Sequence, residues 1–486
     1  MFSKKYSYLF IVLIVSSIAA AAQDSVRVSA ADLQNLLQRI ERLEQAAQLP
    51  ADSPKMTNAE QPEATDIEQL SPADKAKEVG NGRHRLTIGG YGEITAKRCF
   101  YSNKYLRYVT PELYKTDGYG EFALPHVVIY LGYDFGKGWS MGSEIEFEHG
   151  GPEVAMEIEE KEGGSEVEQE IERGGEVTLE QFWLQKRFNR YAIIRAGMQV
   201  VPVGALNAYH MPTEFFSVYR SEGEFTILPS TWHEVALTFM GSTSFGLKYQ
   251  AMFLPGLDSD RFSRKNWVKT GAGSPYEFKL ANVYAGALRL DYEGVRGLRL
   301  SLSGYCGNSF RNSLSNNING DQYKGVRGTV SIGSFDFKYA GHGVLLRGNV
   351  TYGHLGDSQL ITKYNSTSQV ANKTRVASDA IATGMEIGYD FFSLNETLRQ
   401  KKQRFYLFGR YEYYDSMMLY DGKSTPINAW CGRQRAACGL NYFPIDEVAV
   451  KAEFSYGILN KKGGTVIFND EPAIAVGIVY AGMFKL

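Results

Sequence analysis

The sequence predicts an all-β transmembrane barrel of about 16 antiparallel strands, with a short N-terminal coiled-coil helix after a signal peptide. Three observations carry this prediction. Apolar and polar residues alternate with period two in many segments after residue 85. The connections between these segments alternate between tight turns and long polar loops. After the N-terminal signal, no uncharged apolar stretch of about 18 residues occurs, so membrane-spanning helices are not expected.

The residues before the barrel divide into three parts by composition. Lys4 and Lys5 precede a short apolar run that ends in small residues, and this pattern predicts a signal peptide over 1–22. Residues 50–84 are polar and rich in turn formers, and we expect a flexible periplasmic linker there. The segment 23–49 is predicted to form a short coiled coil, and a single amphipathic helix is an equal alternative. Its apolar seam consists of Leu33, Leu36, Ile40, Leu43 and Ala47.

The segment 85–486 is assigned to the barrel because its strands each have one apolar and one polar face. Leu298, Leu300 and Leu302 alternate with arginine and serine, which is the period of a β-strand. The same alternation runs from Val448 to Gly457. Tight turns are expected at 136–138, 189–191, 241–244, 294–297, 340–343 and 444–446, and a longer near-side connection at 395–403. Long loops are expected at 102–120, 150–176, 205–230, 257–280, 308–327, 357–381 and 416–433.

One segment resembles a known family. It runs from Ile193 to Gly241 and reads IIRAGMQVVPVGALNAYHMPTEFFSVYRSEGEFTILPSTWHEVALTFMG. This stretch is similar to the signature of the phosphate-selective porin O and P family. The matching residues are Gly197, Pro202, Val203, Gly204, Asn207, His210, Pro212, Phe215, Arg220, Pro229, Ser230, Trp232 and Gly241. The resemblance implies a trimeric, sixteen-stranded porin whose third outer loop, here Ala205 to Ser230, folds inward as a constriction.

Charged residues at that loop and on the inward faces of the strands are the candidate site. The pore constriction is assigned to His210, Glu214, Arg220, Glu222 and Glu224. The pore-lining cations are expected to be Arg195, Lys248, Arg289, Arg299, Arg347, Arg410 and Lys451. Acidic residues face the same lumen, so ion pairs that support the wall are as plausible as a track for phosphate. They are Glu144, Glu146, Glu148, Asp291, Glu386, Glu412 and Glu453.

Other motifs favour simpler interpretations. Gly138 to Gly142 matches the G-x-S-x-G pattern of hydrolases, but Ser140 follows a tight hairpin rather than opening a helix. His210 and His233 flank the constriction, where they could titrate or serve in loop packing. The acidic segment 153–176 is either a divalent-cation site or, more simply, a solvated loop. Asp258 to Asp260 is interpreted as a turn, and a disulfide between Cys431 and Cys438 is an open alternative.

The expected function is passive diffusion of small hydrophilic solutes or ions, with anions such as phosphate among them. The net charge of −2 gives no reason to expect a nucleic-acid partner. The expected partners are outer-membrane lipid, two further copies of the chain in a homotrimer, and small solutes or inorganic ions. No cofactor, metal or catalytic residue is expected. The alternatives are an outer-membrane barrel enzyme and a structural barrel anchored to the cell wall through its N-terminal segment, which would be periplasmic.

Overall fold

The architecture is that of a closed antiparallel β-barrel with sixteen long strands, seen in a computed structural model. It describes residues 85–486 except 109, 115–116, 149–154, 161–166, 173–176, 275–277, 314–317, 319, 369–370, 421–429, 460–469 and 486. The barrel strands are β1 (Leu86–Cys99), β3 (His126–Gly136), β4 (Trp139–Glu148), β7 (Val177–Arg187), β8 (Ile193–Val200), β9 (His233–Ser242), β10 (Leu247–Pro255), β11 (Tyr284–Val295), β12 (Leu298–Gly307), β13 (Val330–Gly341), β14 (Val344–Leu355), β15 (Asp379–Asp390), β16 (Arg404–Leu419), β17 (Gly432–Ile445), β18 (Val448–Leu459) and β19 (Glu471–Lys485).

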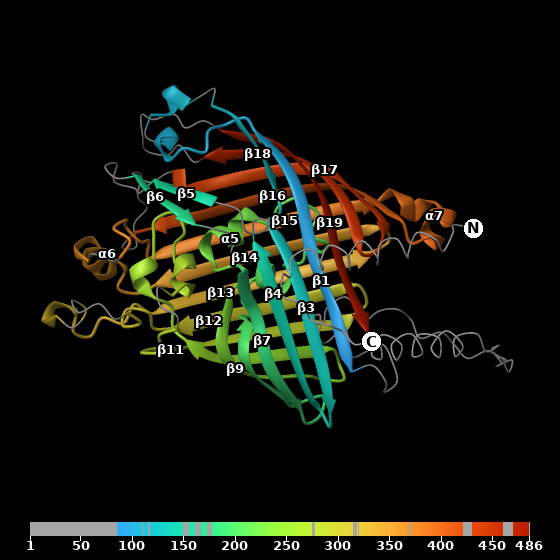
Figure 1. Ribbon diagram of the computed structural model, residues 1–486, viewed down its shortest axis with the longest axis horizontal. Helices are drawn as coiled ribbons and strands as arrows, with labels where there is room; N and C mark the ends of the chain where they lie inside the picture. Colours follow the sequence, from blue (N-terminus) through green and yellow to red (C-terminus); the bar gives the residue numbers. More distant parts are fainter. Residues whose placement is uncertain are drawn as a thin grey trace, which may run out of the picture. The chain divides into compact units, whose positions relative to one another are not determined.

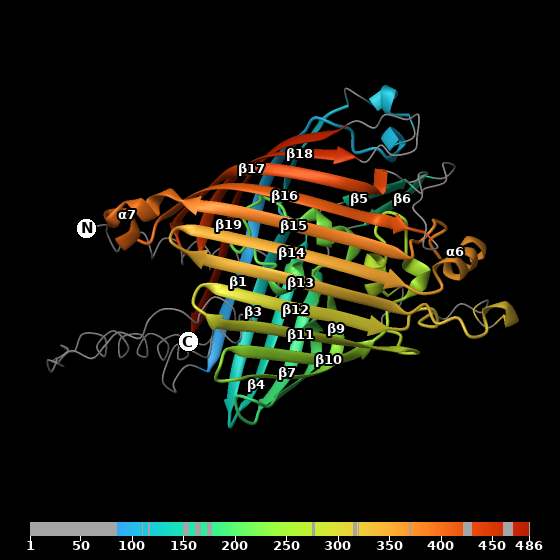
Figure 2. The same cartoon turned by 180° about the vertical axis from the view of Figure 1, so that it is seen from behind.

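The barrel closes by pairing its first strand with its last. Ile88 of β1 pairs with Phe484 of β19, and the antiparallel register continues to Cys99 opposite Ala473. On its other side, β1 pairs with β3 in its first half and with the short strand β2 (Tyr119–Ala123) in its second half. Each other barrel strand pairs with its neighbours in sequence, so the barrel has no free edge. Figures 1 and 2 show the two opposite sides of this arrangement.

The period-two pattern separates a lipid-facing surface from an interior. In β12, the side chain of Leu302 is 58% exposed on the outside, whereas those of Arg299 and Ser301 are buried inside. In β18, Phe454 is likewise exposed while Lys451 and Glu453 are buried. Apolar side chains on the outer face and polar ones on the inner face are the pattern of a transmembrane barrel. The predicted all-β transmembrane barrel of about 16 antiparallel strands is therefore confirmed.

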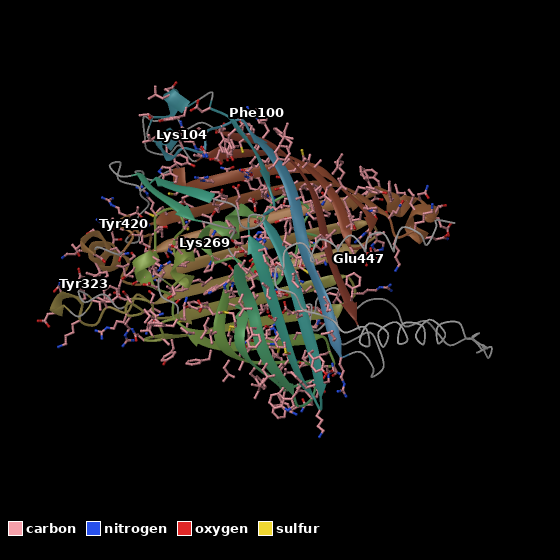
Figure 3. The ribbon with its side chains drawn as sticks, viewed as in Figure 1. Phe100, Lys104, Lys269, Tyr323, Tyr420 and Glu447 are labelled. Carbon is pink, nitrogen blue, oxygen red and sulfur yellow. The ribbon has the colours of Figure 1, made fainter. Side chains whose placement is uncertain are left out.

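The two ends of the barrel differ in the length of their connections. The turn that contains Glu447 lies at one end, and Tyr323 and Tyr420 lie in long loops at the other (Figure 3). All six predicted tight turns are found between strands. The near-side connection after β15 carries η7 (Phe391–Leu394) and α7 (Glu396–Gln400). One long connection, between β18 and β19, was not among the predicted long loops.

The long connections carry the remaining elements. Between β4 and β7 lies a small separate sheet of β5 (Ala155–Glu160) and β6 (Val167–Glu172). The helices are η1 (Tyr105–Tyr108), η2 (Pro111–Tyr114), α4 (Ala205–Ala208), α5 (Glu222–Ile227), η3 (Ser259–Arg261), η4 (Lys269–Ala272), η6 (Asp321–Tyr323) and α6 (Ser358–Thr367). None of the helices in the described residues is long and apolar enough to cross a bilayer.

Several loops pack together in an apolar cluster at the long-loop end. Trp232, Trp267, Phe310 and Tyr364 come from four different connections or their borders, and all are buried in this one cluster. Phe310 and Tyr364 meet edge to face with 5.2 Å between their ring centroids. The burial of these apolar side chains against one another removes them from water, and this stabilises the packing of the loops against the barrel.

The open question of the disulfide is answered by the geometry of β17. Cys431 precedes this strand and is buried, Cys438 lies within it and is exposed, and both thiols are free. Seven extended residues span about 23 Å, and a disulfide requires Cα atoms within about 7 Å of one another.

The predicted signal peptide, coiled coil and linker (1–22, 23–49 and 50–84) lie outside the described residues.

Candidate pore constriction

The segment between β8 and β9 folds into the barrel, as the resemblance implied for Ala205 to Ser230. It contains the short helices α4 and α5, and in Figure 1 α5 lies between the strands of the two walls. The segment buries the side chains of Val203, Phe216, Val218 and Ile227. Removal of this apolar surface from water favours the inward position of the segment. Gly204 begins the turn into the lumen with φ of +86°, a conformation that favours glycine.

Glu224 stabilises the segment from within. Its carboxylate accepts hydrogen bonds from the backbone N–H of Leu206 at 2.8 Å and of Ala205 at 3.2 Å. The hydroxyl of Thr351, on β14, donates to the same carboxylate at 2.6 Å. Burial raises the pKa of Glu224, and these hydrogen bonds oppose the rise. Glu224 therefore connects both short helices to the barrel wall.

Glu222 connects the segment to the wall through an ion pair. Its Oε1 lies 3.0 Å from a guanidinium nitrogen of Arg435 on β17, and the hydroxyl of Tyr414 donates to its Oε2 at 2.7 Å. Burial alone would raise the pKa of Glu222, but the charge of Arg435 and this hydrogen bond outweigh burial and lower the pKa to about 2. The neighbouring Ser221 donates a hydrogen bond to Glu412. Glu222 is thus ionised at any physiological pH.

Lys451 binds the apolar middle of the segment. Its ammonium group, on β18, donates to the carbonyl oxygens of Pro212 at 2.5 Å, Phe215 at 2.6 Å and Ser217 at 2.9 Å. The three N–H bonds of the ammonium are therefore all used by the backbone of the segment. Glu453, two residues further on the same strand, accepts a hydrogen bond from the N–H of Val218 at 3.0 Å.

His210, Glu214 and Arg220 complete the predicted constriction. The ring of His210 lies 5.9 Å from that of Tyr91 on β1, and burial lowers the pKa of this histidine. Glu214 accepts a hydrogen bond from the N–H of Met211, within the segment. Arg220 donates to the hydroxyl of Thr231 at 3.2 Å. The segment therefore contacts β1 as well as β18, two strands of the same part of the wall that are separated by β19.

The predicted pore-lining cations on the strands are engaged by neighbouring groups. Arg289 contacts Asp291 at 2.9 Å and Asp336 at 3.0 Å, and Arg299 contacts Asp336 at 3.3 Å. The remaining pairs are Arg347 with Glu386 at 3.0 Å, Arg410 with Glu412 at 3.2 Å, Lys248 with Glu293 at 2.7 Å and Arg195 with Gln185 at 2.7 Å. Five of these six side chains therefore lie against carboxylates, and Arg195 donates to an amide oxygen.

A cavity remains between the inward segment and the wall. Tyr209 and Phe215 line it from the segment, and Arg347, Glu386 and Glu412 from the strands. The ring of Tyr209 is covered by the guanidinium of Arg299 at 3.6 Å. This cavity therefore combines aromatic and charged side chains beside the segment.

Several residues that hold the segment were not among the predicted site residues. Arg435, Tyr414 and Asn441 each contact it, and Asn441 donates to the carbonyl of Phe216 at 2.9 Å. Apolar and polar residues alternate with period two in their strands, so the inward direction of these side chains was predictable from the sequence. Their contacts with the segment were not predictable, because the partners lie about two hundred residues away along the chain.

Ser140 has the surroundings of a strand residue. It lies in β4 directly after the turn at Gly136 to Gly138, pairs with Asp134 and Gln185, and is buried. A hydrolase elbow places its serine between a strand and a helix, which is a different geometry. Asp258 caps the short helix η3 by accepting a hydrogen bond from the N–H of Asp260, consistent with the predicted turn.

The closed barrel with an apolar outer face defines the chain as an outer-membrane β-barrel protein. No family model matches it. A protein of Aquifex aeolicus (strain VF5), described as uncharacterized, is 26% identical over 397 residues, which cover 79% of this chain and 78% of that protein.

Solved structures of outer-membrane proteins show a weaker likeness. An anion-selective porin from Comamonas acidovorans is 10% identical with a TM-score of 0.48, over 82% of this chain and 100% of that chain. OmpF of Salmonella typhi in complex with daunomycin is 12% identical with a TM-score of 0.48, over 84% and 99% of the two chains. The channel DcaP of Acinetobacter baumannii is 11% identical with a TM-score of 0.44, over 82% and 97%.

Proposed function

We propose that the protein is a passive porin of the outer membrane, which lets small hydrophilic solutes or ions diffuse through a lumen narrowed by the segment between β8 and β9. The observation that carries the proposal is the attachment of this segment inside the barrel. Lys451 on β18 and Arg435 on β17 bind it from the wall. Polar contacts with the wall hold the segment inside the barrel. The segment therefore narrows the water-filled lumen without filling it with packed apolar side chains.

The charge pattern supports weak selectivity. A porin that captures phosphate strongly needs cations whose charge is not cancelled by adjacent carboxylates. Here Arg289, Arg347 and Arg410 each lie within 3.2 Å of a carboxylate oxygen. We therefore propose a general or mildly selective pore, in which phosphate is one of several permeant solutes.

We also propose a homotrimer whose N-terminal segments lie in the periplasm. The support is the apolar seam of 23–49 and the linker of 50–84, which would join a coiled coil to the barrel. Cross-linking of the purified protein in detergent should yield a trimer, and deletion of 23–49 should weaken it. Equal amounts of trimer with and without this segment would remove the coiled coil from the proposal.

The test of the pore is recording from the purified protein in planar lipid bilayers. We expect stepwise conductance increases, a reversal potential near zero in a salt gradient, and only weak block by phosphate. Neutral polymers of graded size should stop entering the pore above the size set by the constriction. Folded protein that inserts into bilayers without adding conductance would overturn the porin, and a strongly anionic reversal potential with phosphate block would overturn weak selectivity.

A further inference from the structure

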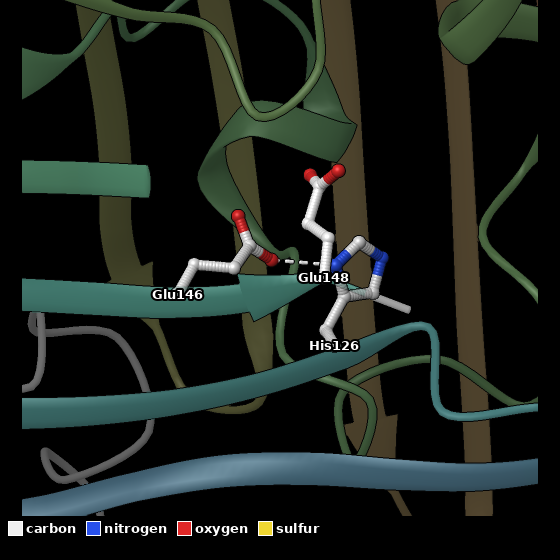
Figure 4. Close-up of side chains that lie close together, drawn as sticks. All are labelled: His126, Glu146 and Glu148. Atoms are coloured by element: carbon white, nitrogen blue, oxygen red, sulfur yellow. Dashed lines mark hydrogen bonds and ion pairs between the residues drawn. The ribbon is translucent and has the colours of Figure 1, made fainter. Parts of the chain in front are cut away.

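One cluster of side chains in the barrel interior has the composition of a metal site. His126 is the first residue of β3 and pairs directly with Glu148 on β4, and Glu146 lies two residues before Glu148 on the same face. Figure 4 shows the three side chains together on one side of the sheet. One ligand atom from each lies within 4.8 Å of the other two. Cross-strand neighbours on one face of a sheet are close enough to bind the same metal ion.

The distances define which atoms would bind. Nδ1 of His126 lies 2.5 Å from Oε1 of Glu146, so these two atoms already face one another. In a zinc site, nitrogen and oxygen ligands lie about 2.0 to 2.2 Å from the ion, which requires His126 and Glu146 to separate by roughly 1 Å. His126 keeps partial exposure, with 20% of its side chain accessible, so an ion can reach the cluster from the lumen.

A fourth residue supplies the second observation. Glu93 on β1 lies beside His126, because Gly92 pairs with Val127, and its Oε1 is 3.7 Å from Nε2 of the imidazole. Glu93 is only 6% exposed, and its Oε2 has no hydrogen-bond partner among the described residues. A carboxylate at the second ring nitrogen is the usual partner of a metal-binding histidine, because it directs the free lone pair of the ring toward the ion.

The surrounding charge also favours a cation. Glu144 and Glu180 are buried in the same part of the wall, and Oε1 of Glu180 has no hydrogen-bond partner among the described residues. Arg220 contributes positive charge near Glu93 and His126, and Lys451 contributes positive charge near Glu93. The carboxylates outnumber these two cationic groups, and carboxylates buried without full pairing are costly unless a further cation compensates them.

We infer that His126, Glu146 and Glu148 form a binding site for a divalent transition-metal ion such as Zn²⁺, oriented by Glu93, on the lumen wall beside the constriction. One imidazole nitrogen and two carboxylates suit Zn²⁺ or Mn²⁺ better than Ca²⁺, which prefers oxygen ligands alone. The remaining coordination positions would be filled by water from the lumen. The site does not depend on the proposed pore function.

The test is calorimetric titration of Zn²⁺ into the full-length protein, purified in detergent and first treated with a chelator. Excess Mg²⁺ in the buffer competes with Zn²⁺ for any weak binding to carboxylates alone, such as those of the acidic segment 153–176. We expect one ion per chain. The variant Glu148→Gln should weaken binding about 100-fold, and it leaves the hydrogen bond between His126 and Glu146 in place to preserve the fold. Glu93→Gln should weaken binding about 10-fold.

The matched control is His354→Asn. His354 also pairs with a carboxylate, with 2.9 Å between its Nδ1 and Oδ1 of Asp379, but no third ligand of this kind joins them within the described residues. This variant should bind Zn²⁺ like the wild type. The site would be overturned if the wild type takes up no Zn²⁺ in excess Mg²⁺. It would also be overturned if Glu148→Gln, folded as judged by circular dichroism, binds as tightly as the wild type.

Discussion

Glu222, on the segment that enters the barrel, forms an ion pair with Arg435 of β17 at 3.0 Å. The pair joins residues from opposite halves of the barrel sequence. Arg435 has a second acidic neighbour, since Glu471 lies 3.8 Å away. The position of the segment therefore depends on a charge on the segment itself and on strands that follow it by about two hundred residues.

The first prediction concerns the acid dependence of this contact. The folded-state pKa of Glu222 is about 2, below its ordinary value of 4.5, so the ionised form stabilises the folded protein. This contribution is fully present above pH 4.5 and is lost as the pH falls toward 2. Thermal unfolding in detergent should show that Glu222→Gln costs about 1 to 3 kcal/mol at neutral pH. The difference between wild type and variant should shrink through that acid window, and a constant difference would contradict the assignment.

The second prediction concerns Lys451. Replacement by methionine keeps most of the side-chain volume but leaves the carbonyls of Pro212, Phe215 and Ser217 without their donor. We expect a more mobile constriction, with larger and noisier single-channel conductance and faster proteolysis near residue 215. Lys248→Met is the control, because Lys248 pairs with Glu293 and not with the segment. Equal conductance in both variants would remove Lys451 from the constriction.

The third prediction uses the pair of Arg347 and Glu386, 3.0 Å apart beside the cavity. Arg347→Met leaves an uncompensated carboxylate and should shift the reversal potential toward cations. Glu386→Gln leaves an uncompensated guanidinium and should shift it toward anions. The double variant should return close to the wild type. Shifts in the same direction for both single variants would show that the pair does not face the permeant ions.

The fourth prediction tests the lipid-facing surface. Leu302 lies in the middle of β12 and is 58% exposed on the outer face. Leu302→Arg should cost about 2 to 4 kcal/mol in denaturant titrations of vesicle-inserted protein, because a charge at the bilayer midplane is poorly solvated. Phe245, 62% exposed in a tight turn, is the matched position near the interface, where an arginine should cost at most about 1 kcal/mol. Equal costs would contradict the placement in the membrane.

The barrel was predictable because its signals are local. The alternation in β12 and β18 depends only on neighbouring residues, and the tight turns are marked by a few turn-forming residues. The interior contacts were less predictable. Val218 meets Glu453 only because the barrel closes and the segment folds across it, and the two residues are 235 positions apart. The sequence could therefore supply the candidates at the constriction but could not pair them. The cluster of His126 with Glu146 could not be predicted from the sequence, because it depends on the register between β3 and β4.

The pairing of β1 with β19 has a consequence for how the protein folds. The last strand must be made before the first can gain its second neighbour, so no partial chain can complete the sheet. Until then, both terminal strands expose unsatisfied backbone groups that can pair with another chain. Contacts over such long sequence separation form slowly. The polypeptide therefore needs protection from self-association during the interval between its export and the joining of its two ends.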